Sequence, residues 1–188
     1  RLAFPFKFTA PKDTPVTDIK EVAIIGAGTM GGGIAMACAN AGLSVVLTDV
    51  GEERLQNALG TIRKNYDSSI KRGRLTQPQV DERIGRIRTQ QGIDAADSAD
   101  LVIEAVFEGM DLKKEVFAAL DHFAKPGSIL ATNTSTLDVD EIGCDTRSRE
   151  DRGHASRQRL AVHVAEALEE LACRNVNEQV EQLVDRLV

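Results

Sequence analysis

The chain has 188 residues, of which 42% are hydrophobic and 28% are charged, and this composition is typical of a globular protein rather than a disordered or fibrous one. The length suffices for one well-filled α/β domain with a short extension, but not for two domains of ordinary size. The net charge of −6 and the pI of about 5.2 argue against a nucleic-acid partner, because nucleic-acid-binding surfaces need clustered basic residues.

The cysteines and the apolar runs restrict the kind of protein further. Cys38, Cys144 and Cys173 lie far apart and lack the paired spacing of zinc ligands, so we expect no metal site and free thiols in a reducing compartment. No apolar run reaches the ~18 residues of a membrane span, and the first residues do not resemble a signal peptide. We expect a location in bacterial cytoplasm or an organelle matrix. Because the sequence starts at Arg1 rather than Met, we expect part of a longer protein.

Strands and helices are predicted to alternate along most of the chain. Residues 1–18 hold three of the five prolines and are predicted to form an extended linker. Short apolar runs predict strands at 19–25, 44–48, 86–89, 101–107 and 128–132. Apolar residues at helical spacing predict helices at 31–41, 52–71, 112–123 and from the Thr76 cap to Ile84. This alternation predicts a parallel, doubly wound sheet within a domain over 19–145.

The pattern changes after Gly143. Residues 147–159 are polar without periodicity, and apolar residues from Ala161 to Val188 recur at helical spacing. We therefore expect residues 146–188 to form a mostly helical tail, with two amphipathic helices that separate near Asn175 and no strand.

A glycine-rich turn stands directly after the first predicted strand. Gly26, Gly28 and Gly31 form the pattern GxGxxG, which opens the next helix through Thr29 and Met30. The first glycine permits the sharp turn, the second lets the backbone approach a pyrophosphate, and the third lets helix and strand pack closely. Unpaired N–H groups at the helix N-terminus would then bind the pyrophosphate.

Asp49 ends the second predicted strand, where an acid would accept hydrogen bonds from the adenosine ribose and repel a 2′-phosphate. The strand, turn, helix and acid together predict a Rossmann-type α/β domain that binds NAD rather than NADP. The alternative is a structural glycine turn beside an incidental surface aspartate.

Three motifs in order give a family resemblance. VAIIGAGTMGGGIA at 22–35, DLVIEAVFE at 100–108 and TNTSTL at 132–137 together resemble the L-3-hydroxyacyl-CoA dehydrogenases. IRKNY at 62–66 and KRGRLT at 71–76 look most like the multifunctional β-oxidation proteins, in which such a domain follows an enoyl-CoA hydratase module and a linker. The resemblance covers about residues 20–143.

The resemblance implies roles for three further residues. Glu108 and Lys113 would line the nicotinamide side of the cofactor, and Ser135 would contact both the cofactor and the 3-oxygen of the substrate. Glu108 and Ser135 follow predicted parallel strands, at the edge of the sheet where ligands bind. A helix-capping acid and a turn serine are the alternative interpretations.

The resemblance also implies a histidine that takes the hydroxyl proton and a glutamate that orients it, in a Gly-Leu-His-Phe-Phe-x-Pro pattern that this chain lacks. RGHASRQ stands at 152–158 instead, and Glu166 lies twelve residues after His154, as in the family's pair. Two interpretations stay open. His154 and Glu166 are a diverged catalytic pair, or the tail is unrelated sequence from truncation or a changed reading frame, and both are surface residues.

The function that the resemblance implies is oxidation of L-3-hydroxyacyl-CoA to 3-ketoacyl-CoA with NAD, in fatty-acid β-oxidation. An acyl-CoA would be the substrate, and the chain would form a homodimer or part of a larger multifunctional chain. The family's helical C-terminal domain is missing from this sequence, so the alternative function is an NAD-binding module without turnover of its own.

Overall fold

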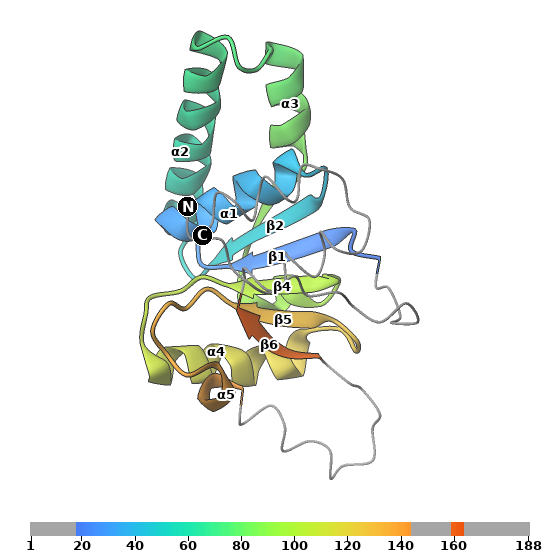
Figure 1. Cartoon of the computed structure of the whole chain (residues 1–188), viewed down its shortest axis with the longest axis vertical. Coiled ribbons are helices and arrows are strands. Elements are labelled where there is room, and N and C mark those ends of the chain that lie inside the picture. The colour runs from blue at the N-terminus through green and yellow to red at the C-terminus, as the bar shows by residue number, and fades with distance from the viewer. Residues whose placement is uncertain (1–17, 144–158, 164–188) are drawn as a thin grey trace, which may run out of the picture.

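The computed structural model describes residues 18–143 and 159–163, which form one open parallel sheet with helices on both faces (Figure 1). The strands are β1 Glu21–Ile25, β2 Ser44–Asp49, β3 Ile87–Gln91, β4 Leu101–Glu104, β5 Ile129–Thr132 and β6 Arg159–His163. The helices are α1 Thr29–Asn40, α2 Glu52–Lys71, α3 Gln77–Gly85, α4 Met110–Phe123 and α5 Val139–Ile142, with a 3-10 turn, η1, at Ile93–Ala96.

The order of the strands confirms the predicted doubly wound topology. The sheet reads β3-β2-β1-β4-β5-β6, and all pairs of neighbouring strands are parallel. The chain moves outward from β1 to β2 and β3, then returns to place β4 on the other side of β1. Ligands of such sheets bind where this direction reverses, outside the carboxyl ends of β1 and β4.

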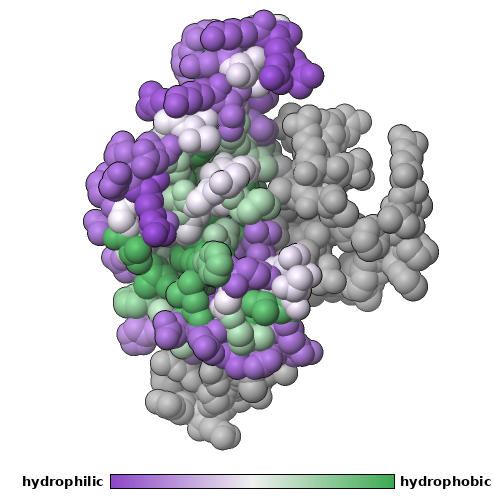
Figure 2. Space-filling view, turned by 90° about the vertical axis from the view of Figure 1, so that its left-hand side faces the viewer, coloured by the Kyte–Doolittle hydropathy of each residue, from purple (hydrophilic) through white to green (hydrophobic). Residues whose placement is uncertain are grey.

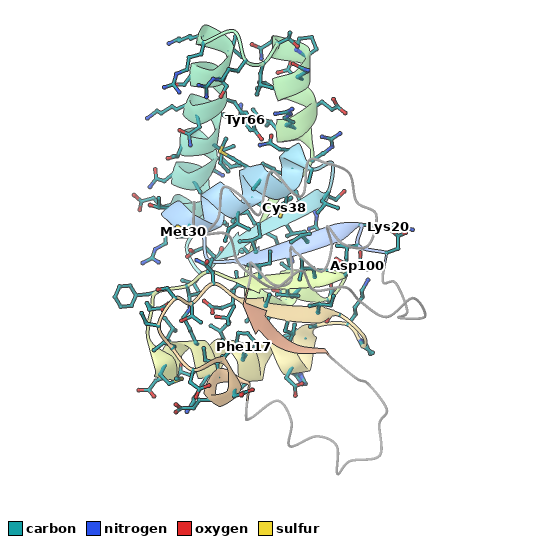
Figure 3. All side chains as sticks on the ribbon, viewed as in Figure 1. Lys20, Met30, Cys38, Tyr66, Asp100 and Phe117 are labelled. Atoms are coloured by element: carbon teal, nitrogen blue, oxygen red, sulfur yellow. The ribbon has the colours of Figure 1, made fainter. Side chains whose placement is uncertain are left out.

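Alternating side chains of β1 divide the core into two layers. Val22 and Ile24 pack on the side of α1 and α2, whereas Ala23 and Ile25 pack on the side of α4. This alternation is the period of two that a strand imposes. Figure 3 shows Phe117 of α4 between that helix and the sheet, where its side chain is fully buried. A sheet covered on both faces explains why its central strands are nearly continuous apolar runs.

Helices α2 and α3 extend beyond the sheet as an antiparallel pair (Figure 1). Buried Tyr66 of α2 donates from its hydroxyl to Asn40 Oδ1 at 3.0 Å, and Arg83 of α3 donates to the same oxygen at 3.0 Å. The predicted Thr76 cap is confirmed, since Thr76 and Gln79 form a capping box that starts α3. Asn40 therefore joins α1 to both helices of the pair.

Asp100 forms hydrogen bonds at the end of the sheet where the strands begin. Its carboxylate accepts hydrogen bonds from the backbone amides of Lys20 and Glu21, at 2.8 and 2.9 Å, and from Lys125 Nζ. Burial alone would raise the pKa of Asp100, but these hydrogen bonds and the lysine charge outweigh it and hold the pKa below its ordinary value. Figure 3 shows Lys20 and Asp100 at this end and Met30 at the other.

Strand β6 corrects the prediction of a tail without strands. Residues Arg159–His163 pair in parallel with β5, in a register that joins Ala131 to Val162 and Thr132 to His163. The free edge of β5 offers backbone N–H and C=O groups that a short segment can pair with, and this tertiary pairing outweighs the local helical spacing. The predicted linker at 1–18, except for its last residue, and the predicted helices beyond residue 163 lie outside the described residues.

Candidate cofactor site

Two glycines of the turn are required by close packing. Gly26 has a φ of +109°, and a Cβ on it would lie 2.7 Å from the carbonyl oxygen of Ala105 on the neighbouring strand segment. A Cβ on Gly31 would lie 1.8 Å from the carbonyl oxygen of Gly26. A side chain at Gly26 would therefore push the turn away from the segment after β4, and one at Gly31 would push helix α1 away from β1 and the turn.

Gly28 differs from these two glycines because a Cβ there would meet nothing within 4 Å. It is the N-cap of α1, with extended backbone and no side-chain hydrogen bond to the helix amides. Thr29 and Met30 follow in the first turn, and both are exposed. An open helix N-terminus with a bare backbone is a fitting site for a pyrophosphate, which supplies the acceptors that the helix amides lack.

Asp49 lies beside this turn at the carboxyl end of β2. Its Oδ2 accepts a hydrogen bond from Ala27 N at 2.9 Å, and its Oδ1 accepts one from Gly51 N at 3.3 Å. The carboxylate is largely buried, with 7% of the side chain exposed, and Arg54 lies 3.9 Å away. A carboxylate accepts about four hydrogen bonds, so two remain for ribose hydroxyls. The residues present thus fit the adenosine half of NAD.

Apolar side chains are also exposed near the ends of the strands. Met30, Val50 and Phe107 are 50%, 81% and 84% exposed, and each follows the carboxyl end of a strand. Figure 2 looks onto the face where the strands end and shows hydrophobic residues gathered there between polar margins. Exposed apolar surface of this kind marks an interaction site, for a ligand or for another protein surface.

A buried ion pair stands at the carboxyl end of β4. Lys113 Nζ in the first turn of α4 lies 2.8 Å from both carboxylate oxygens of Glu104, and both side chains are fully buried. The same ammonium lies 3.4 Å from Glu108 Oε2. Lys113 is expected to line the nicotinamide side of the cofactor, but its side chain is buried. Its ammonium group contacts Glu108, whose side chain is partly exposed on the open face.

Glu108 organises the loop after β5. Its Oε1 accepts hydrogen bonds from Thr134 Oγ1 at 2.5 Å, Ser135 N at 3.2 Å and Thr136 Oγ1 at 3.2 Å. Burial raises the pKa of Glu108, but the hydrogen bonds from Thr134 and Ser135 and the charge of Lys113 outweigh it, so the pKa lies below its ordinary value. The side chain is an ionised acceptor at neutral pH and is bonded to the loop rather than capping α4, whose N-cap is Gly109.

The structure thus brings Glu108, Lys113 and Ser135 together, and it sets the glycine turn beside Asp49. His154 and Glu166 lie outside the described residues. Sequence reasoning missed Glu104 and Thr132, which donates to Glu104 Oε2 at 2.6 Å. The signal was present, because a glutamate that ends a fully apolar strand needs a buried partner.

No helix among residues 18–143 is long and apolar enough to cross a bilayer. The described part of the chain also holds no group of three or more histidine, cysteine, aspartate or glutamate side chains that could bind a metal ion.

The fold and the glycine turn define a dinucleotide-binding domain. A family model for the NAD binding domain of 3-hydroxyacyl-CoA dehydrogenase matches residues 21–183, farther along the chain than the motifs alone reach. The chain belongs to this family, and its cofactor is NAD, as the position of Asp49 predicts.

Relatives and solved structures agree with this family. The chain is 35% identical over 169 residues to a glyoxysomal fatty acid beta-oxidation multifunctional protein from Brassica napus, covering 90% of this chain and 23% of the relative. It is 40% identical over 129 residues to a probable 3-hydroxybutyryl-CoA dehydrogenase from Bacillus subtilis, covering 69% of this chain and 45% of the relative. The chain therefore spans less than half the length of these relatives.

The solved structure of (S)-3-hydroxybutyryl-CoA dehydrogenase from Ralstonia eutropha has a TM-score of 0.70 and 30% identity, covering 90% of this chain and 61% of that one. For 3-hydroxybutyryl-CoA dehydrogenase from Escherichia coli the TM-score is 0.65 at 38% identity, over 67% of this chain and 27% of that one.

Proposed function

We propose that this chain is the NAD-binding part of an enzyme that interconverts L-3-hydroxyacyl-CoA and 3-ketoacyl-CoA in fatty-acid β-oxidation. One observation carries the proposal. In a chain of this dehydrogenase family, the glycine turn, Asp49 and the Glu108–Ser135 contact all lie at the carboxyl ends of the strands. NAD, when bound, accepts the hydride and returns it in the reverse direction.

Each half of the site has a separate task. The amides of the α1 N-terminus, at Thr29 and Met30, bind the pyrophosphate, and Asp49 accepts hydrogen bonds from the adenosine ribose. Glu108 holds the loop that carries Ser135 at the nicotinamide end. The exposed Ser135 hydroxyl then contacts the 3-oxygen of the substrate and fixes its orientation.

The proton of the substrate hydroxyl needs an acceptor, for which we propose His154, with Glu166 as its orienting partner. The ordinary pKa of histidine, about 6.5, suits proton transfer near neutral pH, and a carboxylate partner fixes its tautomer. Acyl-CoA is the proposed substrate, in bacterial cytoplasm or an organelle matrix. The proposed assembly is a homodimer or a larger multifunctional chain.

Calorimetric titration of the full chain with NADH tests the cofactor site, and NADH oxidation with acetoacetyl-CoA tests turnover. We expect NADH binding, and an absence of binding at millimolar NADH would overturn the proposal. If turnover is measured, it should be lost in His154→Ala and kept in His122→Ala, a matched control at an exposed position on α4.

The second candidate function is an NAD-binding module without turnover of its own. The observation that favours it is RGHASRQ at 152–158, in place of the pattern that the family resemblance leads us to expect around the histidine. NADH binding without acetoacetyl-CoA-dependent oxidation, unchanged in His154→Ala, would decide for this second function.

A further inference from the structure

We propose that Glu104 is a positioning residue for the nicotinamide end of the cofactor site, acting through Lys113 on Glu108. The inference rests on the proposed function, since Glu108 is taken to lie at that end. Glu104 itself is fully buried and does not reach the open face, so any effect on the cofactor must be transmitted.

Glu104 joins three segments that converge behind the site. Its Oε1 accepts from Val106 N at 2.7 Å, and its Oε2 accepts from Thr132 Oγ1 at 2.6 Å, while both oxygens contact Lys113 Nζ at 2.8 Å. These bonds tie the end of β4 to the end of β5 and to the first turn of α4. The buried carboxylate therefore sets where the ammonium lies.

The ammonium in turn sets where Glu108 lies. Lys113 is fully buried and cannot turn its charge toward water, so its position depends on its two carboxylate neighbours. The contact to Glu104 is short and two-pronged, whereas the contact to Glu108 is longer, at 3.4 Å. Without the charge of Glu104, the ammonium would shift toward Glu108 and draw that carboxylate from the loop.

That loop is where a displacement would matter. Glu108 Oε1 alone accepts hydrogen bonds from Thr134, Ser135 and Thr136. A shift of this oxygen would therefore change the orientation of all three residues. Within residues 18–143 no hydrogen bond joins the side chains of this cluster to the glycine turn or to Asp49, although Gly26 packs against Ala105, next to Glu104. The effect of Glu104 should therefore be much larger at the nicotinamide half of the cofactor than at the adenosine half.

ADP-ribose lacks only the nicotinamide, and a comparison with NADH separates positioning from stability. In Glu104→Gln, which keeps the shape and an acceptor oxygen, we expect the Kd of NADH to rise about tenfold and the Kd of ADP-ribose to change by less than about twofold. Glu115→Gln, at an exposed position on the same helix, is the matched control and should change neither Kd. Calorimetry on the full chain measures both ligands.

A double variant tests whether the effect passes through Glu108. If it does, Glu104→Gln combined with Glu108→Gln should bind NADH about as well as Glu108→Gln alone, because the second change removes what the first one disturbs. Additive losses would overturn the inference. An equal loss for NADH and ADP-ribose in Glu104→Gln, or no loss for either, would overturn it too.

These outcomes are distinct from failure of the proposed function, in which the unaltered chain itself would not bind NADH. Should Glu104→Gln not fold, Thr132→Val decides, since it removes one hydrogen bond to Glu104 without removing a charge. We expect a loss of about threefold for NADH with ADP-ribose unaffected. An unchanged NADH affinity in a folded Thr132→Val variant would overturn the inference.

Discussion

Gly28→Ala should weaken NADH binding, whereas Gly31→Ala should lower the stability of the fold, although the two residues are only three positions apart. Gly28 has a φ of −75°, which alanine adopts without strain, and its added Cβ would enter open space. The loss of a favourable cap and the lower entropy of the unfolded chain nearly cancel, so we expect a stability change within about 1 kcal/mol. The methyl group, however, would occupy the place proposed for the pyrophosphate.

Binding is therefore where Gly28→Ala should act. Loss of one or two charge-assisted hydrogen bonds between helix amides and phosphate corresponds to about 2–3 kcal/mol, or a rise of about 30- to 150-fold in the Kd of NADH. In Gly31→Ala, the Cβ would lie 1.8 Å from Gly26 O, whereas real contacts stay above 3.0 Å, so backbone must move. Overpacking of this kind costs about 1–3 kcal/mol or more, which lowers the unfolding midpoint by about 3–10 °C.

Thermal unfolding and NADH calorimetry on the same samples measure both effects. Gly42→Ala offers no matched control, because Gly42 has a φ of +91°. Gly60→Ala is the matched control, since it adds a Cβ in open space on α2, outside the turn. The reasoning is refuted if Gly28→Ala binds NADH as tightly as the unaltered chain, or if it loses as much stability as Gly31→Ala.

Three further predictions concern single side chains. Asp49→Ser should weaken NADH binding about tenfold and raise the affinity for NADPH relative to NADH, because the charge that repels a 2′-phosphate is lost; an unchanged ratio in calorimetry would contradict this. Asp100 has a lowered pKa in the fold, so its stabilisation is present above pH 3.8 and is lost as the pH falls through the folded-state pKa. Urea unfolding of Asp100→Asn should therefore give lower stability at pH 7 and a flatter decline below pH 3.8, and an equally steep decline would disagree. Tyr66→Phe should cost about 1 kcal/mol in urea unfolding through the lost bond to Asn40, with NADH affinity unchanged.

The central fold could be predicted from the sequence because local and tertiary signals coincide there. The apolar run of β1, the glycine turn and the capped start of α3 each specify one conformation by sterics or by a single cap. Helix α2 occupies residues 52–71, as its spacing predicts. The outer strand β6 could not be predicted, since its conformation depends on the edge of β5 rather than on its own residues.

The candidate site was predictable in part for the same reason. Gly26, Gly28, Gly31 and Asp49 form a pattern of fixed spacing, so their meeting follows from one strand–helix–strand unit. The contact of Glu104 with the last residue of β5 and the contact of Glu108 with the loop after β5 join residues more than twenty positions apart. Only the pairing of β4 with β5 brings them together, and no local pattern encodes it.

Asp100, just before β4, binds Lys125, just after α4, and Glu104, which ends β4, binds Lys113 in the first turn of α4; the two pairs differ in what they contribute to stability. Asp100 and Lys125 are partly exposed, and such pairs add about 1 kcal/mol or less. Glu104 and Lys113 are fully buried, where desolvation offsets the attraction, so stability alone gives little reason for this pair.

A variant without either buried charge separates stability from position. Glu104→Gln with Lys113→Met keeps an acceptor oxygen for Val106 N, lets the new amide donate to Thr132 Oγ1, and fills the space of the lysine stem, so we expect unfolding free energy within about 2 kcal/mol of the unaltered chain. Because Glu108 then loses its ammonium neighbour, NADH binding should weaken while ADP-ribose binding persists. Full NADH affinity in this stable variant would mean that the buried pair only fastens α4 to the sheet.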